Sequence, residues 1–318
     1  MNTALETCLS SPIARYVELK RALGRHFYAE SRVLQRLNTF LGDRGAADLS
    51  WIEFEQWSHA HSHLTAATRR HLMQIVRNFC LYRRRTEPHC FVPDKLLFPA
   101  LSQPVQPHIF SDAQITQLLK SAACLQAGPR SPLRPEVFRL AIVLLYCTGM
   151  RRSELVRLRL ADYDRQQRTL LIRESKFHRS RYVPIAQDVV WELDAYLAVR
   201  RHRRLPMLAD SPLLWNRHGH GRPYTGGGLW QGLHALFQAA DVHKADGTVP
   251  RVHDLRFTFA VQTLLRWYRS GIDVQAKLPM LSRYMGHVSI ESTEYYLPWI
   301  PELALAASNK FGYIRVYQ

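Results

Sequence analysis

Near its carboxyl end the chain carries a histidine and a tyrosine at a spacing that could do phosphoryl chemistry. His287 is followed nine residues later by Tyr296, within the stretch LSRYMGHVSIESTEYYL. A phenolate can attack phosphorus and leave a stable covalent ester, so a tyrosine among basic and histidine side chains is a candidate nucleophile for a phosphodiester. Adjacent tyrosines such as Tyr295 and Tyr296 are also common as core or interface residues. The assignment of a nucleophile therefore depends on the rest of the chain.

Three further stretches hold side chains that could bind or protonate a phosphate. Arg151 lies in TGMRRSEL, which predicts a tight turn that opens a helix. Lys176 lies in SKFHRSRYVPI, in the tip region of a predicted hairpin. His253 and Arg256 lie in HDLRFTFA, three residues apart and therefore on one face of a helix. Attack on a charged phosphodiester needs charge neutralisation, an in-line nucleophile and a proton for the leaving oxygen, and these residue types supply all three.

The order and spacing of these six positions resemble the tyrosine recombinase family, also called the phage integrase family. The resemblance covers the predicted catalytic domain and, more loosely, the amino-terminal helices, which are similar to the family's core-binding domain. It implies a mainly α fold with a small β-sheet, in which a helical core-binding domain precedes an α+β catalytic domain. It also implies a site-specific DNA recombinase that cuts and rejoins strands through a 3′-phosphotyrosine intermediate, with no metal or other cofactor.

By this resemblance Arg151 and Arg256 hold the phosphate with planar guanidinium forks, and Lys176 is the general acid for the leaving 5′ oxygen. Arg152 is equally basic, but the family pattern places the arginine after Thr-Gly and one apolar residue, which selects Arg151. Glu154 matches a commonly acidic position and is expected to support an arginine rather than to act in the chemistry.

His253 and His287 resemble the two further active-site positions, which donate hydrogen bonds to the phosphate and help to take the proton of the tyrosine. Tyr296 is the nucleophile in this scheme, because its spacing from His287 fits the family better than that of Tyr295. Phe257 departs from the pattern, since the family often has a histidine there, and this departure concerns local packing.

The elements that must position these residues are mainly helices. Capping-box pairs, Ser50 with Glu53 and Ser111 with Gln114, each predict a helix start. Two short branched-rich runs, 170–172 and 181–185, predict the hairpin, whose Arg179 and Arg181 either touch DNA or are solvated. Helical spacing of apolar residues predicts further helices over 13–40, 65–84, 137–147, 189–199, 229–237 and 255–267.

Prolines at positions 93, 99, 104 and 107 interrupt this pattern and predict a linker. We therefore predict a helical core-binding domain over 1–92, a linker over 93–108 and a catalytic domain with a carboxyl-terminal segment over 109–318. A helix over 301–309 is expected to dock on a neighbouring copy or to fold back on its own domain.

The charge balance favours a polyanionic partner. The 318 residues include 43 Lys and Arg against 26 Asp and Glu, a formal charge of +17 with a pI near 10.0. Arg69, Arg70 and Arg77 lie largely off the apolar face of a predicted helix, where they are either solvated or in contact with a DNA backbone. We expect double-stranded DNA as the partner and, by resemblance, a tetramer on DNA with accessory recombinase proteins as further candidate partners.

The remaining composition argues against several classes of protein. Five cysteines, an odd number without CxxC spacing, favour neither a disulfide framework nor a zinc site and suggest a reducing compartment. His59, His61 and His63 alternate, a spacing that suits a solvated loop better than a metal site. Apolar runs fall short of a membrane helix, and the amino terminus does not have the pattern of a signal peptide. These features predict a soluble, intracellular protein, and the resemblance to the recombinase family implies the bacterial cytoplasm.

Two other functions fit part of the pattern. A type IB topoisomerase uses a similar set of residues to relax supercoils, although the two-domain length and the second histidine favour a recombinase. A DNA-binding regulator with a decayed active site is the other alternative, against which the intact catalytic positions argue. The sequence does not distinguish integration, excision, transposition, resolution and inversion, although the run QAKLPMLSRYMGH resembles recombinases of bacterial mobile elements.

Overall fold

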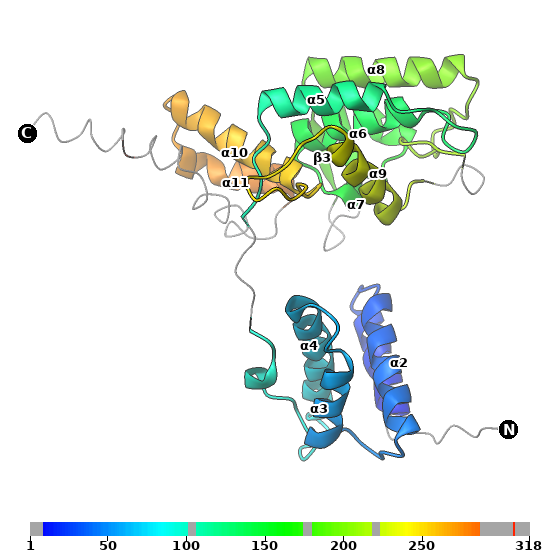
Figure 1. Cartoon of the computed structure of the whole chain (residues 1–318), viewed down its shortest axis with the longest axis vertical. Helices are drawn as coiled ribbons and strands as arrows, with labels where there is room; N and C mark the ends of the chain where they lie inside the picture. Colours follow the sequence, from blue (N-terminus) through cyan, green and yellow to red (C-terminus); the bar gives the residue numbers. More distant parts are fainter. Residues whose placement is uncertain (1–8, 101–105, 174–179, 218–222, 287–307, 309–318) are drawn as a thin grey trace, which may run out of the picture. The chain divides into compact units, whose positions relative to one another are not determined.

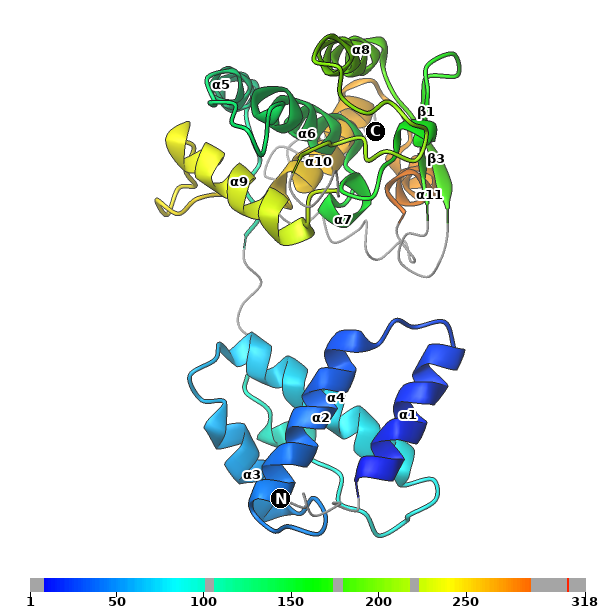
Figure 2. The same cartoon turned by 90° about the vertical axis from the view of Figure 1, so that its right-hand side faces the viewer.

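The computed structural model describes residues 9–100, 106–173, 180–217, 223–286 and 308, and the chain divides into two compact units (Figures 1 and 2). The first unit is Met1–Val105 and the second is Gln106–Gln318. The first is helical in the residues described, and the second adds a small sheet to its helices. The prediction of a mainly α fold with a small sheet is confirmed.

Four helices form the first unit: α1 (Ser10–Ala22), α2 (Tyr28–Asp43), α3 (Trp51–Ala60) and α4 (Ala66–Arg83). The helical stretch predicted over 13–40 is two helices, because the backbone turns left-handed at Gly24 (φ 77°) and Phe27 (φ 49°). At the start of α3 the hydroxyl of Ser50 accepts a hydrogen bond from the amide of Glu53, as its sequence predicted.

The stretch predicted as a linker is partly packed on the first unit. Lys95–Leu97 form a 3₁₀ helix (η1), and the side chain of Phe98 is 6% exposed within the apolar core of that unit. The division between the two units falls after Val105.

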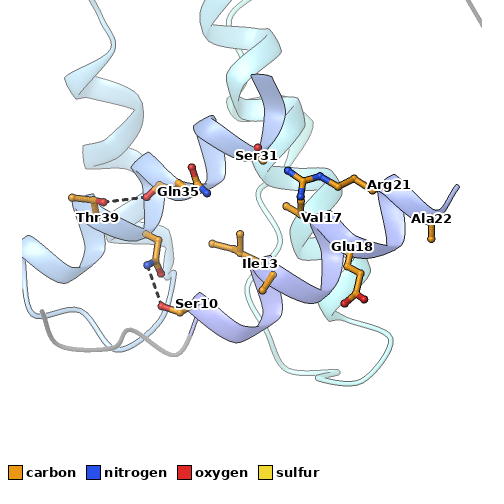
Figure 3. Close-up of a pocket in the computed structure, with 11 residues that line it drawn as sticks. Ser10, Ile13, Val17, Glu18, Arg21, Ala22, Ser31, Gln35 and Thr39 are labelled. Carbon is orange, nitrogen blue, oxygen red and sulfur yellow. Dashed lines mark hydrogen bonds between the residues drawn. The ribbon is translucent and has the colours of Figure 1, made fainter. Parts of the chain in front are cut away.

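A pocket opens between α1 and α2 of the first unit (Figure 3). Ile13 and Val17 line it on the side of α1, and Gln35 and Thr39 line it on the side of α2. Its lining residues belong to the first unit, whereas all six predicted catalytic residues belong to the second.

The second unit is built around one buried helix. Its helices are α5 (Asp112–Ala123), α6 (Arg134–Thr148), α7 (Arg152–Leu155), α8 (Gln187–His202), α9 (Gly226–Ala239), α10 (Asp254–Arg269) and α11 (Val274–Met285). Helix α6 packs against α5, α8 and α10, which explains its nearly continuous apolar sequence. The predicted capping box at Ser111 and Gln114 is present at the start of α5.

The sheet has three antiparallel strands in the order β1 (Tyr163–Asp164), β2 (Thr169–Ile172) and β3 (Arg181–Pro184). The hairpin of β2 and β3 confirms the prediction, with Ile172 opposite Arg181. The two-residue strand β1 was not predicted. Within the described part of the chain, no helix is long and apolar enough to span a membrane.

Candidate active site

Three of the six predicted catalytic residues, Arg151, His253 and Arg256, lie in the part of the chain that the structure describes. The other three, Lys176, His287 and Tyr296, lie outside the described residues. The structure therefore gives the geometry of the two arginines, of the first histidine and of the groups in contact with them.

Arg256 is a buried residue in the first turns of α10. Only 2% of it is exposed, although it is charged. One terminal nitrogen, Nη1, donates to the carbonyl oxygen of Gly149, and the other, Nη2, donates to that of Met285 at 2.9 Å. The guanidinium thus joins the end of α6 to the end of α11, and its planar fork is what allows one side chain to reach both.

Arg151 stands at the start of α7, directly after a tight turn. Gly149 ends α6 in a left-handed conformation (φ 59°), and the backbone then extends through Arg151 into α7. The Arg151 guanidinium donates from Nη1 to Oε1 of Glu154 at 2.9 Å and from Nη2 to the carbonyl oxygen of Gly286 at 2.8 Å. Its side chain keeps 24% of its surface exposed, so it can still meet a ligand.

Glu154 is a buried carboxylate shared by two arginines, and its predicted supporting role is confirmed. Besides Arg151, the side chain of Arg181 donates to it, from Nη1 to Oε1 at 3.1 Å and from Nη2 to Oε2 at 2.9 Å. Burial alone would raise the pKa of this carboxyl, but the bonds and charge of Arg181, with a smaller effect of Arg151, lower the pKa below its usual value. Glu154 is therefore ionised at neutral pH.

Arg181 was not identified as part of the site from the sequence, which left it between DNA contact and solvation. It is not a solvated side chain, because it is only 12% exposed and is held by Glu154 and by the end of α11. A buried glutamate requires a cationic partner, but nothing in the sequence shows which of the many arginines supplies it.

The last carbonyls of α11 bring the three arginines together. Arg181 Nε donates to the carbonyl oxygen of Tyr284 at 2.8 Å, Arg256 to that of Met285 and Arg151 to that of Gly286. Such carbonyls have no partner within their own helix and carry its negative dipole end, so cationic donors stabilise them. We call Arg151, Arg181 and Arg256 the arginine clasp. It holds the end of α11 directly before His287.

Tyr284 fixes the same helix end from its side chain. Its hydroxyl donates to the carbonyl oxygen of Pro184 in β3 at 3.1 Å, and its ring stacks on that of Phe259 in α10. Burial raises the pKa of this tyrosine to about 12. It is therefore a structural phenol, in contrast to the nucleophile predicted at Tyr296.

His253 directly precedes α10, three residues before Arg256. Loss of hydration among its neighbours, followed by the positive charge of Arg256, lowers the pKa of His253 to about 4, although the residue keeps an exposed surface. Its imidazole is neutral at pH 7 in the free protein, so one ring nitrogen can accept a proton or a hydrogen bond. Phe257, the departure from the family pattern, is buried against α11 in a cluster with Leu281 and Met285.

The predicted DNA-contact arginines of α4 each have a partner within the first unit. Arg70 Nη1 donates to the carbonyl oxygen of Pro99 at 2.8 Å, Arg77 donates to that of Pro93, and Arg69 donates to the hydroxyl of Ser58 at 3.4 Å. Two of them therefore hold the proline-rich stretch onto α4. A guanidinium has five N–H donors, so these bonds leave donors for a phosphate.

Metal ligation has no support among the residues described. No group of three or more histidine, cysteine, aspartate or glutamate side chains there could hold an ion. The ring of His61 instead bonds the carbonyl oxygen of Trp57 through Nδ1 at 2.7 Å. The cysteines of the described ranges, Cys80, Cys90, Cys124 and Cys147, are free thiols.

Alanine at position 286 should disturb the arginine clasp. Gly286 is left-handed (φ 68°), and a Cβ there would lie 2.7 Å from Nη1 and 2.9 Å from Cζ of Arg181. We expect Gly286→Ala to lose about 1–2 kcal/mol of unfolding free energy from the backbone strain and about 1–3 kcal/mol more from the collision. Denaturant unfolding of the purified variant measures the sum.

Gly247 is the matched control for that substitution. It is also left-handed (φ 77°), but an added Cβ there would meet nothing within 4 Å. Gly247→Ala should therefore lose the strain alone. Equal losses in the two variants would show that Arg181 moves aside freely and that the clasp tolerates a side chain at 286.

Comparison with known sequences identifies a family and several relatives. The model of the phage integrase family matches residues 111–299. A putative integrase/recombinase of Sinorhizobium fredii, y4rB, is 31% identical over 300 residues, which cover 94% of this chain and 95% of that protein. The tyrosine recombinase XerD of Mycobacterium leprae is 36% identical over 162 residues, or 50% of this chain and 46% of that protein.

Solved structures with a similar fold include two recombinases bound to DNA. The Tn1549 transposon integrase in complex with transposon right end DNA has a TM-score of 0.64 at 16% identity, covering 95% of this chain and 99% of that one. The XerH site-specific recombinase bound to a palindromic difH substrate has a TM-score of 0.62 at 16% identity, covering 96% of this chain and 86% of that one. At these identities the likeness is one of fold.

Proposed function

Because the chain belongs to the phage integrase family and is a tyrosine-type site-specific DNA recombinase, we propose that it cleaves and rejoins DNA through a covalent 3′-phosphotyrosine intermediate. The arginine clasp is the observation that carries this proposal. Arg151 and Arg256 come from sequence positions about a hundred residues apart, yet both hold the end of the helix that leads into His287 and Tyr296. The scissile phosphate binds at these two guanidinium groups.

The chemical step exchanges one phosphodiester for another. The phenolic oxygen of Tyr296 gives its proton to a histidine of the site and forms a bond to phosphorus while the bond from phosphorus to the 5′ oxygen breaks. The departing oxygen takes its electron pair and a proton from the ammonium group of Lys176. A 5′ hydroxyl of another strand later attacks the phosphotyrosine and releases the tyrosine. One phosphodiester replaces another at each step, so the reaction requires no external energy source, and we propose that the side chains of the site carry it out without a metal.

The two histidines donate hydrogen bonds to the phosphate and help to take the proton of Tyr296. In the free protein His253 is neutral at pH 7, so it can accept a hydrogen bond as well as donate one. His287 follows directly on Gly286, whose carbonyl oxygen is bonded to Arg151. This connection supports a place for His287 beside the same phosphate.

The substrate that we propose is double-stranded DNA carrying a specific recombination site. The formal charge of +17 supports a polyanion, and the similarly folded Tn1549 integrase and XerH are both described in complex with DNA. Arg69, Arg70 and Arg77 of the first unit are proposed phosphate contacts. We further propose that four copies assemble on two sites, with or without accessory recombinases, in the bacterial cytoplasm and in the movement or resolution of a mobile element.

A covalent-adduct assay in the presence of a metal chelator tests this function. Purified protein is incubated with labelled DNA from the regions that flank its own gene, and complexes that survive detergent are mapped to the nucleotide. We expect one attachment point per strand, at the 3′ phosphate of the fragment that lies 5′ to the break, with a free 5′ hydroxyl on the other fragment. Binding without an adduct, also on nicked substrates that trap the intermediate, would favour a DNA-binding regulator instead. Relaxation of a supercoiled plasmid that lacks the mapped site would favour a topoisomerase.

A further inference from the structure

Arg181 is an arginine of the site that takes no part in the chemical step proposed above. It is the β3 residue opposite Ile172, where the paired part of the hairpin ends. It makes two hydrogen bonds to Glu154 and one to the carbonyl oxygen of Tyr284. We propose that Arg181 is a positioning residue for Arg151 and acts through Glu154, an inference that rests on the proposed phosphate-binding role of Arg151.

The carboxylate of Glu154 lies between the two arginines and bonds to both. Oε1 of Glu154 accepts from Nη1 of Arg151 and Nη1 of Arg181, while Oε2 accepts from the amide of Arg151 and Nη2 of Arg181. Each oxygen therefore accepts one bond from Arg151 and one from Arg181, so the orientation of the carboxylate depends on both arginines. The side chain of Glu154 is 1% exposed, so water cannot replace a lost bond.

Arg181 also sets the charge that Arg151 presents to a phosphate. Two guanidinium groups and one carboxylate leave one net positive charge in the group. Without Arg181, Glu154 would neutralise Arg151 alone, and the carboxylate would turn its free lone pairs toward that arginine. The guanidinium of Arg151 is held by Glu154 through Nη1 and by the carbonyl oxygen of Gly286 through Nη2. If the carboxylate moved, the bond to Gly286 alone would not fix the position of the guanidinium.

Lysine is the informative substitution at position 181 because it keeps the positive charge but lacks the planar guanidinium group. An ammonium group can approach one oxygen of Glu154, but it cannot reproduce two parallel bonds to the carboxylate and a third to Tyr284. Misplacement of a phosphate-binding group by about 1 Å costs roughly 10²-fold in rate. We expect Arg181→Lys to slow single-turnover formation of the adduct by about that factor on DNA with a normal scissile phosphate.

A methylphosphonate at the mapped scissile position separates a positioning role from a general structural one. The methyl group replaces one non-bridging oxygen and removes the negative charge, so the reaction no longer depends on charge neutralisation by Arg151. If Arg181 acts through Arg151, the loss caused by Arg181→Lys relative to the unaltered protein should shrink to about tenfold or less on this substrate. A loss of equal size on both substrates would overturn the proposal.

The variant Arg151→Ala tests whether Arg151 binds the scissile phosphate. Adduct formation by this variant on normal DNA should be roughly 10²–10³-fold slower than by the unaltered protein, and the difference in rate should be smaller on the methylphosphonate substrate. If it is not, the phosphate-binding role of Arg151 fails, and the role of Arg181 fails with it. In the double variant Arg151→Ala, Arg181→Lys, the loss should be no greater than in Arg151→Ala alone, because residues that act through one another are not additive.

Arg173 provides the matched control on the same hairpin. It directly follows β2, pairs with Asp162, and its side chain is 55% exposed. Arg173→Lys should cleave both substrates at the rate of the unaltered protein. Melting temperatures and DNA binding, measured for every variant, identify any that has lost its fold, and a fold defect would slow cleavage on both substrates alike.

Discussion

Phenylalanine at position 296 should abolish the covalent adduct while DNA binding persists. The substitution removes one oxygen, the atom proposed to bond to phosphorus, and no other group of the site can replace it as the anchor of the 3′ phosphate. The expected result is a protein that shifts labelled DNA in a gel but leaves no complex after detergent. Because Tyr296 lies outside the described residues, its assignment depends on the family pattern and on its spacing from His287.

Tyr295→Phe is the control for that experiment, since the two tyrosines are adjacent and lose the same atom. It should leave the yield of adduct within about a factor of a few, the scale of a substitution that removes no reacting group. If Tyr295→Phe abolishes the adduct and Tyr296→Phe retains it, the nucleophile has been assigned to the wrong residue. If both variants retain it, the intermediate is not a phosphotyrosine at this position.

Lysine at position 256 should reduce cleavage by roughly 10²–10³-fold, the range seen when one charge-stabilising donor is lost from an active site. Arg256 is buried and joins the carbonyl oxygens of Gly149 and Met285, two acceptors that a single ammonium group cannot bridge. A buried carbonyl left without its donor costs about 1–3 kcal/mol. We therefore expect a fall in unfolding free energy beside the loss of cleavage, measured by denaturant unfolding and adduct formation.

Arg269→Lys is the control in this case. It lies in the last turn of the same helix, α10, and is exposed. The same exchange there should change neither stability nor cleavage appreciably. Full cleavage by Arg256→Lys would show that the charge of this residue suffices and that its fork has no part in binding the phosphate.

The elements of the fold that could be predicted from the sequence are those governed by local rules. The capping box at Ser111 depends on four consecutive residues, and the apolar sequence of α6 depends on burial on all sides, so both are visible in the chain itself. The break between α1 and α2 was missed because apolar spacing continues through it, although Gly24 and Phe27 turn left-handed. Strand β1 was missed because two residues carry no periodic pattern.

The candidate site could be predicted only as far as its residue types allow. Arg151, His253 and Arg256 stand in motifs with a recognisable spacing, and the structure shows how the two arginines are held. Arg181 was left between solvation and DNA because its partners are a carboxylate 27 residues away and a carbonyl oxygen 103 residues away. Backbone acceptors such as those of Tyr284 and Met285 have no signature in a sequence, since every residue type has the same carbonyl group.

The arginine clasp makes the end of α11 a meeting point for three separate segments of the chain. One arginine comes from the turn after α6, one from β3 and one from α10, and each occupies a different carbonyl of the same helix end. Displacement of any one segment breaks a charge-assisted bond and removes a support that the other two share. The position of the residues that follow Gly286 in the chain therefore depends on the turn after α6, on β3 and on α10 at once.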